Sequence, residues 1–330
     1  MKMKIQLTVL ASAAAFAAPA GYHITNEIKV GGAGGWDYLT VDSAARRLYV
    51  SHATKVVVID MDGGKVAGEI PDTPGVHGIA IAPELNKGFV SNGRGNNVTI
   101  FDLKTLKSLG QIATGQNPDA IQYEPVSGKI YTFNGTSKDA TAIDAKTGKV
   151  EGTIKLGGKP EFSAADGKGR IYVNIEDTAE IVEIDAAKMK ETKRYSIKPC
   201  ESPSGLAMDT AKRHIFSVCE NEMMAISDPD SGKVIATPAT GKGADGAAFD
   251  PGSGLAFSSN GQDGTLSIVQ EKSGKWTVEN VPTKKSARTM TVDPKTHDLY
   301  LPAAEMAPAA AGAKRPTALP NSFEILVMNR

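Results

Sequence analysis

The chain is poor in several kinds of residue that mark common protein classes. Its 330 residues include two cysteines and two tryptophans, and 37 basic residues balance 37 acidic ones. Zero net charge leaves no strong positive field, so nucleic acid is not an expected partner. No apolar run reaches the roughly 20 residues that a membrane-spanning helix needs, and no membrane span is expected.

Sequence motifs of common active sites are also absent. G-x-S-x-G, H-E-x-x-H and C-x-x-C do not occur, which excludes the local patterns of α/β hydrolases, zinc proteases and CxxC thiol enzymes. Residues 241–246 match G-x-G-x-x-G literally. A strand-like segment follows them, in place of the helix whose N-terminus would bind a pyrophosphate. A catalytic site made of distant residues is not excluded by these absences.

The first 20 residues resemble a secretory signal peptide. Lys2 and Lys4 precede an apolar run at residues 5–17, and an A-x-A cleavage site ends at Ala20. The apolar run, about 13 residues, is too short to span a bilayer. We expect cleavage near Ala20 and a mature chain, residues 21–330, that is periplasmic or secreted.

A four-stranded repeat dominates the mature chain. A turn with a lysine at a fixed position recurs at intervals of 41 to 43 residues, at Lys65, Lys107, Lys149, Lys190, Lys233 and Lys275. An apolar strand precedes each turn and another follows it, and a second pair of strands lies upstream. Units of four strands at this period are typical of β-propeller blades, with a linear solenoid as the alternative.

The ends of the chain favour a closed ring. Seven second strands predict seven blades in one domain, at approximately residues 36–76, 77–118, 119–160, 161–203, 204–245, 246–287 and 288–330 plus 23–31. The seventh unit stops after its third strand, whereas residues 23–30 form a strand with no preceding partner. Placing this strand in the vacant position removes two exposed edges. The predicted fold is an all-β, seven-bladed β-propeller of four-stranded antiparallel blades, closed by the N-terminal strand.

The ends of the second strands resemble the YVTN-type repeats of YncE-like periplasmic propellers. Leu48-Tyr-Val-Ser-His52, Gly88-Phe-Val-Ser-Asn92 and Ile130-Tyr-Thr-Phe-Asn134 carry this likeness, which extends over essentially the whole mature chain. The fifth unit departs from it with Cys219 in place of asparagine. The seventh departs further, with an Ala/Pro-rich insert at residues 303–321 that we expect to be a flexible loop, or else a lid or partner-binding arm. The resemblance implies a fold and a periplasmic location but no particular activity.

The resemblance also implies which loops share a face. The loop entering each innermost strand opens around the central channel, and one residue per blade would lie at this channel mouth: Asp37, His77, Asp119, Glu161, Ser204, Asp245 and Arg288. Clustered carboxylates suit a divalent metal or another cationic ligand. Alternatively, these side chains solvate the strand ends around a water-filled channel. Trp36 and Tyr38, beside Asp37, form either a stacking platform or packing between blades.

Cys200 and Cys219 would lie on the same face in the propeller register. The oxidising compartment favours a disulfide between them. Two separate thiols are the alternative, and the nearby Met223 and Met224 add the option of a copper site.

The expected function is binding or scaffolding by a monomer, with a small-molecule or protein ligand on the channel face. The alternative is a metal-assisted enzyme similar to propeller lactonases or lyases, which would recruit Asp37, Glu161, His77 and Arg288. A divalent metal is the only cofactor that the sequence suggests, and no residue is identified as catalytic. Two tryptophans are too few for the larger quinone-dependent propeller dehydrogenases.

Overall fold

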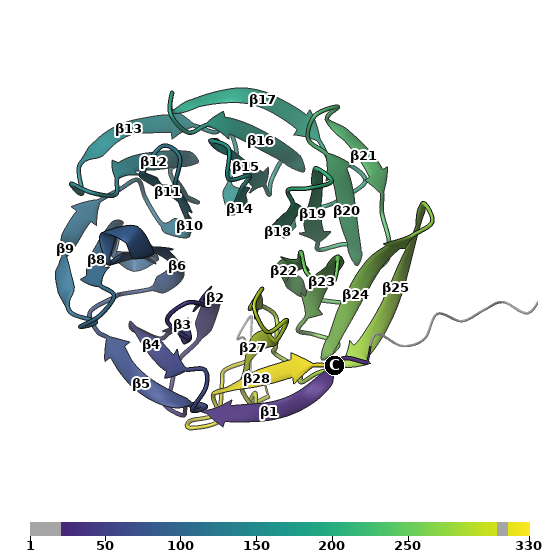
Figure 1. Ribbon diagram of the computed structural model, residues 1–330, viewed down its shortest axis with the longest axis horizontal. Helices are drawn as coiled ribbons and strands as arrows, with labels where there is room; N and C mark the ends of the chain where they lie inside the picture. The colour runs from purple at the N-terminus through teal and green to yellow at the C-terminus, as the bar shows by residue number, and fades with distance from the viewer. Residues whose placement is uncertain (1–20, 309–315) are drawn as a thin grey trace, which may run out of the picture.

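The computed structural model describes residues 21–308 and 316–330. Its strands form seven four-stranded antiparallel sheets, arranged as blades around a central channel (Figure 1). The predicted seven-bladed β-propeller is therefore confirmed. The predicted signal peptide, residues 1–20, lies outside the described residues.

Blades are numbered here in the chain order of their first strands. Blade one contains β2 (Trp36–Asp42), β3 (Arg47–His52), β4 (Lys55–Asp60) and β5 (Lys65–Ile70). Blade two contains β6 (Val76–Ala82), β7 (Lys87–Asn92), β8 (Asn97–Asp102) and β9 (Ser108–Ala113). Blade three contains β10 (Pro118–Glu124), β11 (Lys129–Asn134), β12 (Asp139–Asp144) and β13 (Val150–Lys155). Blade four contains β14 (Pro160–Ala165), β15 (Arg170–Ile175), β16 (Glu180–Asp185) and β17 (Lys190–Ser196).

The remaining blades follow the same order, except that the last one borrows a strand. Blade five contains β18 (Pro203–Asp209), β19 (His214–Cys219), β20 (Met223–Asp228) and β21 (Lys233–Ala236). Blade six contains β22 (Ala244–Asp250), β23 (Leu255–Asn260), β24 (Thr265–Lys272) and β25 (Lys275–Pro282). Blade seven contains β26 (Thr291–Val292), β27 (Leu299–Ala303), β28 (Glu324–Asn329) and β1 (His23–Lys29).

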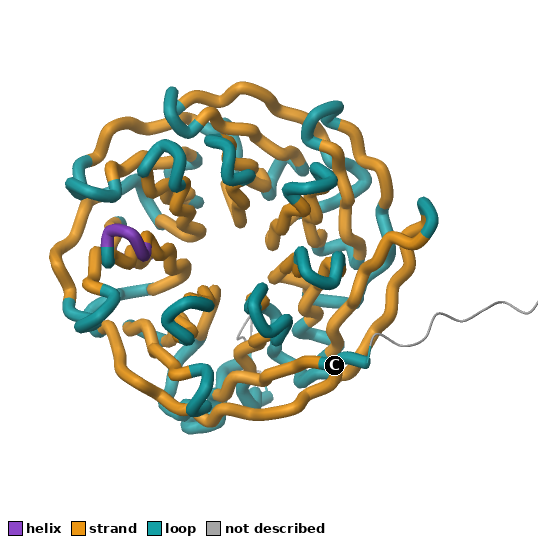
Figure 2. The backbone as a smooth tube through the Cα atoms, viewed as in Figure 1, coloured by secondary structure: helices purple, strands orange, loops and turns teal. Residues whose placement is uncertain are grey.

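Strands make up every layer of the ring, from the channel to the rim (Figure 2). The short helical turns η1 (Pro83–Leu85) and η2 (Gly93–Gly95) both belong to blade two. Among the described residues, no helix is long and apolar enough to cross a membrane.

Burial explains why the middle strands read as apolar runs. Val56, Val57, Val58 and Ile59 in β4 are each at most 1% exposed, because the two faces of a middle strand pack against the blades on either side. The fourth strand β5 is mostly exposed, because no further strand covers its outer edge. The hydrophobic core is therefore a series of apolar layers between neighbouring blades.

The recurring lysine follows a residue in the left-handed backbone conformation. The residue before it has a positive φ in each of the six turns, and in four of them this residue is a glycine: Gly64, Gly148, Gly232 and Gly274. The other two turns place Leu106 and Met189 there, at φ +61° and +52°. The side chains of Leu106 and Met189 reach Gly68 and Gly152 on the outer strand of the preceding blade. Packing between blades thus offsets the strain of the left-handed backbone.

Ring closure depends on β1, which pairs antiparallel with β28. We call this strand pair and its apolar contacts the seam. Tyr22, 4% exposed, packs edge-on against Phe257 of blade six with ring centroids 5.3 Å apart. Ile28 joins the apolar layer between blades seven and one, together with Trp36 and Phe323. The N-terminal strand therefore contacts both neighbours of the gap that it fills, and closure by this strand is confirmed.

The insert of blade seven contains a short paired ribbon. The backbone N–H of Ala307 donates to Thr317, at 2.8 Å, and that of Leu319 donates to Glu305, at 2.7 Å. These hydrogen bonds pair residues 305–307 with residues 317–319, inside the segment for which we expected a flexible loop. Residues 309–315 lie outside the described residues.

Candidate functional site at the channel mouth

The first strands aim consecutive side chains into the channel. In β2 the register shifts between Trp36 and Leu39, and β6, β10, β14, β18 and β22 shift at the corresponding place. Such a shift interrupts the alternation of side chains along a strand. Asp37 and Tyr38 both reach the channel for this reason.

Blades two, four and six also anchor the mouth residue of the next blade. The hydroxyl of Ser91 donates to the carbonyl of Asp119. Equivalent bonds run from the Asn174 amide to the carbonyl of Ser204, at 2.9 Å, and from the Ser259 hydroxyl to the carbonyl of Arg288. These donors occupy the fifth position of the second strand, which is the serine or threonine position of the YVTN-like pattern. The repeat shows this position in the sequence, but it does not reveal that the side chain reaches the next blade.

Five mouth residues form a row of alternating charge across five consecutive blades. Arg288 contacts both Asp245 and Asp37, with Nη1 3.4 Å from Asp37 Oδ1. His77 Nδ1 lies 2.6 Å from Asp37 Oδ2 and 3.6 Å from Asp119 Oδ1. The order around the ring is Asp245, Arg288, Asp37, His77 and Asp119. The structure therefore brings acids and bases together where the sequence suggested mainly an acidic ring.

Glu161 and Ser204 stand apart from this row. Glu161 Oε1 accepts from Lys159 Nζ at 2.6 Å, and Lys159 also contacts Glu176. The Ser204 hydroxyl donates to the carbonyl of Ala244 at 3.3 Å. The mouth thus combines a charged row, a carboxylate with its own lysine, and one neutral position.

Burial perturbs several titrations at the mouth. Burial raises the pKa of Asp119, and the charges of Asp37 and Asp245 raise it further against the opposing effect of His77. Burial and the charge of Asp119 likewise raise the pKa of Glu161. For His77, burial lowers the pKa, but the hydrogen bond to Asp37 and the neighbouring carboxylates outweigh it and raise the value to about 9. Burial and neighbouring charges thus leave the pKa values of Asp119, Glu161 and His77 above their usual ranges.

One oxygen in the row is poorly satisfied. Asp119 Oδ1 is inaccessible to solvent and has no hydrogen-bond partner among the described residues. Leaving a buried acceptor without a partner costs about 1–3 kcal/mol. Asp119 is therefore the residue of the row that would gain most from a bound cation.

Two aromatic rings contact each other across the channel beside the mouth. Tyr38 on β2 and Phe162 on β14 come from blades on opposite sides of the channel (Figure 1), and their ring centroids are 4.8 Å apart. This contact shows that side chains reach across the channel at this level. Trp36 is 9% exposed and packs on Phe323 at 5.2 Å, so it is a packing residue between blades.

Buried asparagines fix the loops around the mouth. The Asn134 amide donates to Asp139 Oδ1 at 2.8 Å and to Thr141 Oγ1 at 2.9 Å. Asn92 and Asn260 make the same pair of contacts to the residues five and seven positions later. The terminal asparagine of the YVTN-like pattern is thus the residue that orders the loop between the second and third strands.

Blade five replaces this asparagine with a cysteine. Cys219 ends β19, and a disulfide joins it to Cys200 with a Cα–Cα distance of 5.4 Å. The bond ties the linker between blades four and five to the mouth face.

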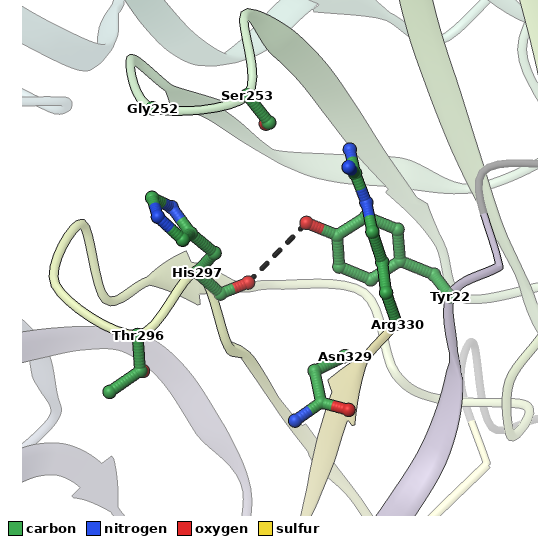
Figure 3. A pocket seen from close by; sticks show the side chains of 7 residues that line it. All are labelled: Tyr22, Gly252, Ser253, Thr296, His297, Asn329 and Arg330. Atoms are coloured by element: carbon green, nitrogen blue, oxygen red, sulfur yellow. Dashed lines mark hydrogen bonds between the residues drawn. The ribbon is translucent and has the colours of Figure 1, made fainter.

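A second concave region lies on the opposite face, at the seam. It has a volume of about 290 Å³ and is lined by Tyr22, Gly252, Ser253, Thr296, His297, Asn329 and Arg330. Figure 3 shows the Tyr22 hydroxyl directed at the carbonyl of His297, 3.4 Å away. His297 Nδ1 lies 3.0 Å from Asp250 of the preceding blade. Arg213 contacts Asp166 between blades five and four in the same way. The His297 contact is therefore one of several contacts between a basic and an acidic side chain that join neighbouring blades.

Comparisons with known proteins identify the fold. No protein-family model and no curated protein sequence matches the chain. Solved structures match, among them a chain of hydrazine synthase from Kuenenia stuttgartiensis. That similarity has a TM-score of 0.70 at 17% sequence identity, and covers 82% of this chain and 92% of that chain. At this identity the likeness shows a shared β-propeller fold.

Proposed function

We propose that this protein is a periplasmic binding or scaffold protein of the YVTN-repeat type that takes a small-molecule or protein ligand at its channel mouth. The row of alternating charge from Asp245 to Asp119 carries the proposal. Its members come from five blades and are held by bonds between blades, whereas charged loop ends that merely solvate strands need no such alignment. The aromatic contact between Tyr38 and Phe162 spans the channel beside the mouth.

The proposed location and family rest on sequence features. The basic, apolar and A-x-A segments at residues 1–20 support export. The buried strand-end asparagines, of which Asn134 is one, support the YVTN-type repeat because each has the same structural task.

A thermal-shift screen of residues 21–330 tests the proposal. The screen covers metal ions, sugars, amines and redox cofactors, each compared between the wild type and two variants. Arg288→Gln removes the arginine between two mouth carboxylates. The matched control Arg46→Gln removes an arginine that contacts Asp293 and Asp62 on the opposite face.

We expect a ligand that raises the melting temperature of the wild type and of Arg46→Gln, and that loses at least half of this shift in Arg288→Gln. A ligand that stabilises all three chains equally would place binding elsewhere. If no compound in the panel shifts the wild type and pull-down on the immobilised chain recovers no partner, the proposal is overturned.

A metal-assisted enzyme is the second candidate function, favoured by Glu161. A buried carboxyl with a raised pKa can act as an acid or base near neutral pH, and Glu161 lies beside Lys159 at the mouth. Turnover of a lactone panel with added divalent metal, abolished in Glu161→Gln, would support it. Absence of turnover, or activity retained in that variant, would remove it.

A further inference from the structure

Three side chains at the mouth place potential metal-ligand atoms close to one another. His77 Nδ1, Asp37 and Asp119 each offer a ligand atom, and these atoms lie within 4.8 Å of one another. They come from β6, β2 and β10, the first strands of three consecutive blades. Ligands on one metal ion, about 2.1 Å from it, are roughly 3 to 3.5 Å apart. Small side-chain rotations therefore suffice to gather these atoms around an ion.

The imidazole of His77 is held with Nδ1 toward the two carboxylates. Its opposite edge lies against Gly93, where a β-carbon would stand 2.7 Å from Nε2. Any side chain at residue 93 would displace the imidazole ring of His77 from this position. The glycine thus leaves the space that the His77 ring occupies in this orientation.

The carboxylates of Asp37 and Asp119 differ in the contacts that orient them. Asp37 is oriented by Arg288, which lies 3.4 Å from its Oδ1, while Oδ2 faces His77. Such outer contacts typically hold metal ligands in place. Asp119 Oδ1 faces His77 from the other side, is inaccessible to solvent, and lacks a hydrogen-bond partner in the described part of the chain. A bound cation would supply the partner that this oxygen lacks.

We propose that Asp37, His77 and Asp119 bind a divalent transition-metal ion at the channel mouth. One imidazole nitrogen with two carboxylate oxygens suits zinc, manganese, iron or cobalt, whereas calcium prefers six to eight oxygens. Three protein ligands leave coordination positions open toward the mouth. The inference rests on the proposed function of the mouth as a binding site, and names the ion that would take part in it.

Titration of the chelator-treated chain, residues 21–330, with Zn²⁺, Mn²⁺ or Co²⁺ alone tests this inference. We expect calorimetry to give one ion per chain, and bound Co²⁺ to show a visible spectrum that changes with ligand number. Asp119→Asn and His77→Gln should each weaken binding at least tenfold. His297→Gln is the matched control, because it removes a histidine paired with a single aspartate on the opposite face, and its affinity should stay within threefold of the wild type.

Melting curves establish that each variant still folds before its affinity is interpreted. The inference is overturned if no ion binds at one per chain, or if Asp119→Asn and His77→Gln bind as tightly as the wild type. Equal loss in His297→Gln would also overturn it, since binding would then not report the three-residue site. A screen ligand that depends on Arg288 while no metal binds would leave the proposed function standing and remove the metal alone.

Discussion

The seam and the channel mouth are two places where distant parts of the chain meet, and they are held by different forces. The seam is backbone pairing and buried apolar packing, with Tyr22 and Ile28 at most 4% exposed. The mouth is a row of partly buried charges. Asp37 and Arg288, which lie 251 residues apart in sequence, are neighbours at the mouth because the seam has closed the ring.

Because of this difference, we expect the seam to contribute mainly to folding stability and the mouth mainly to ligand binding. Apolar burial contributes free energy of folding without regard to direction. Buried charges gain little net stability but hold a defined geometry. Changes at the seam should therefore move the melting temperature, and changes at the mouth should mainly alter binding.

Removing the seam strand should have the largest effect. Deleting residues 21–31 exposes an edge of β28 and loses the burial of Tyr22 and Ile28, each worth about 1.5–3 kcal/mol. We expect the melting temperature to fall by at least about 10 °C, measured by circular dichroism. A chain beginning at Gly21 is the control. An unchanged transition would contradict closure by β1.

Breaking the disulfide tests whether the mouth face depends on more than charge. The bond closes a loop with a sequence separation of 19 residues, for which the expected contribution is about 3 kcal/mol. Replacing Cys200 and Cys219 with serine should lower the free energy of unfolding by this amount in urea titrations. Reductant should destabilise the wild type and leave the double variant unchanged. Two reactive thiols in the denatured, unreduced wild type would refute the bond.

Acid should weaken the seam through His52. This side chain is 1% exposed and stacks on Phe323 at 4.1 Å. Burial first, and the nearby Lys55 second, lower its pKa from 6.5 to about 4. The unfolded chain therefore takes up a proton as the pH falls through 6.5, while the folded chain does not until about pH 4, so stability is lost across that range.

The size of this effect follows from the two pKa values. Between pH 7 and pH 5, His52 should account for about 2 kcal/mol of lost stability. His52→Asn, which places at this position the residue that blades two, three and six already carry, should lose about that much less in urea titrations at the two pH values. An identical pH dependence in both chains would show that His52 does not titrate in this way.

The blades were predictable because their information is local. The positive-φ residue before Lys65 and its equivalents sets the period, and each strand pair lies within one unit. The unpaired N-terminal strand predicted the closure, since the chain offered a single vacancy for it. Both the number of blades and the closing strand could therefore be predicted by comparing each unit with the repeat.

The contacts at the mouth and seam were less accessible from sequence. His77 and Asp119 were assigned to the mouth, but their pairing depends on side-chain orientation across blades, which the repeat does not encode. The contact between Tyr38 and Phe162 joins non-adjacent blades. His52 occupies an asparagine position, and nothing near it in sequence predicts stacking on Phe323, which follows the irregular insert.

The smallest effect is expected for the hydrogen bond from the Ser91 hydroxyl to the Asp119 carbonyl, which we call the clamp. It joins blade two to the backbone of a mouth residue in blade three. Ser91→Ala removes the hydroxyl that donates to the carbonyl of Asp119, and should cost about 1 kcal/mol in urea titrations. Ser227→Ala is the control, since Ser227 is a buried hydroxyl that is hydrogen-bonded to the Tyr195 hydroxyl at 3.2 Å, between blades five and four. Both variants should lose similar stability, but only Ser91→Ala should also weaken Zn²⁺ binding, by a few-fold, because it loosens the backbone that carries Asp119. Equal Zn²⁺ affinities in the two variants would mean that the mouth holds its geometry without the clamp.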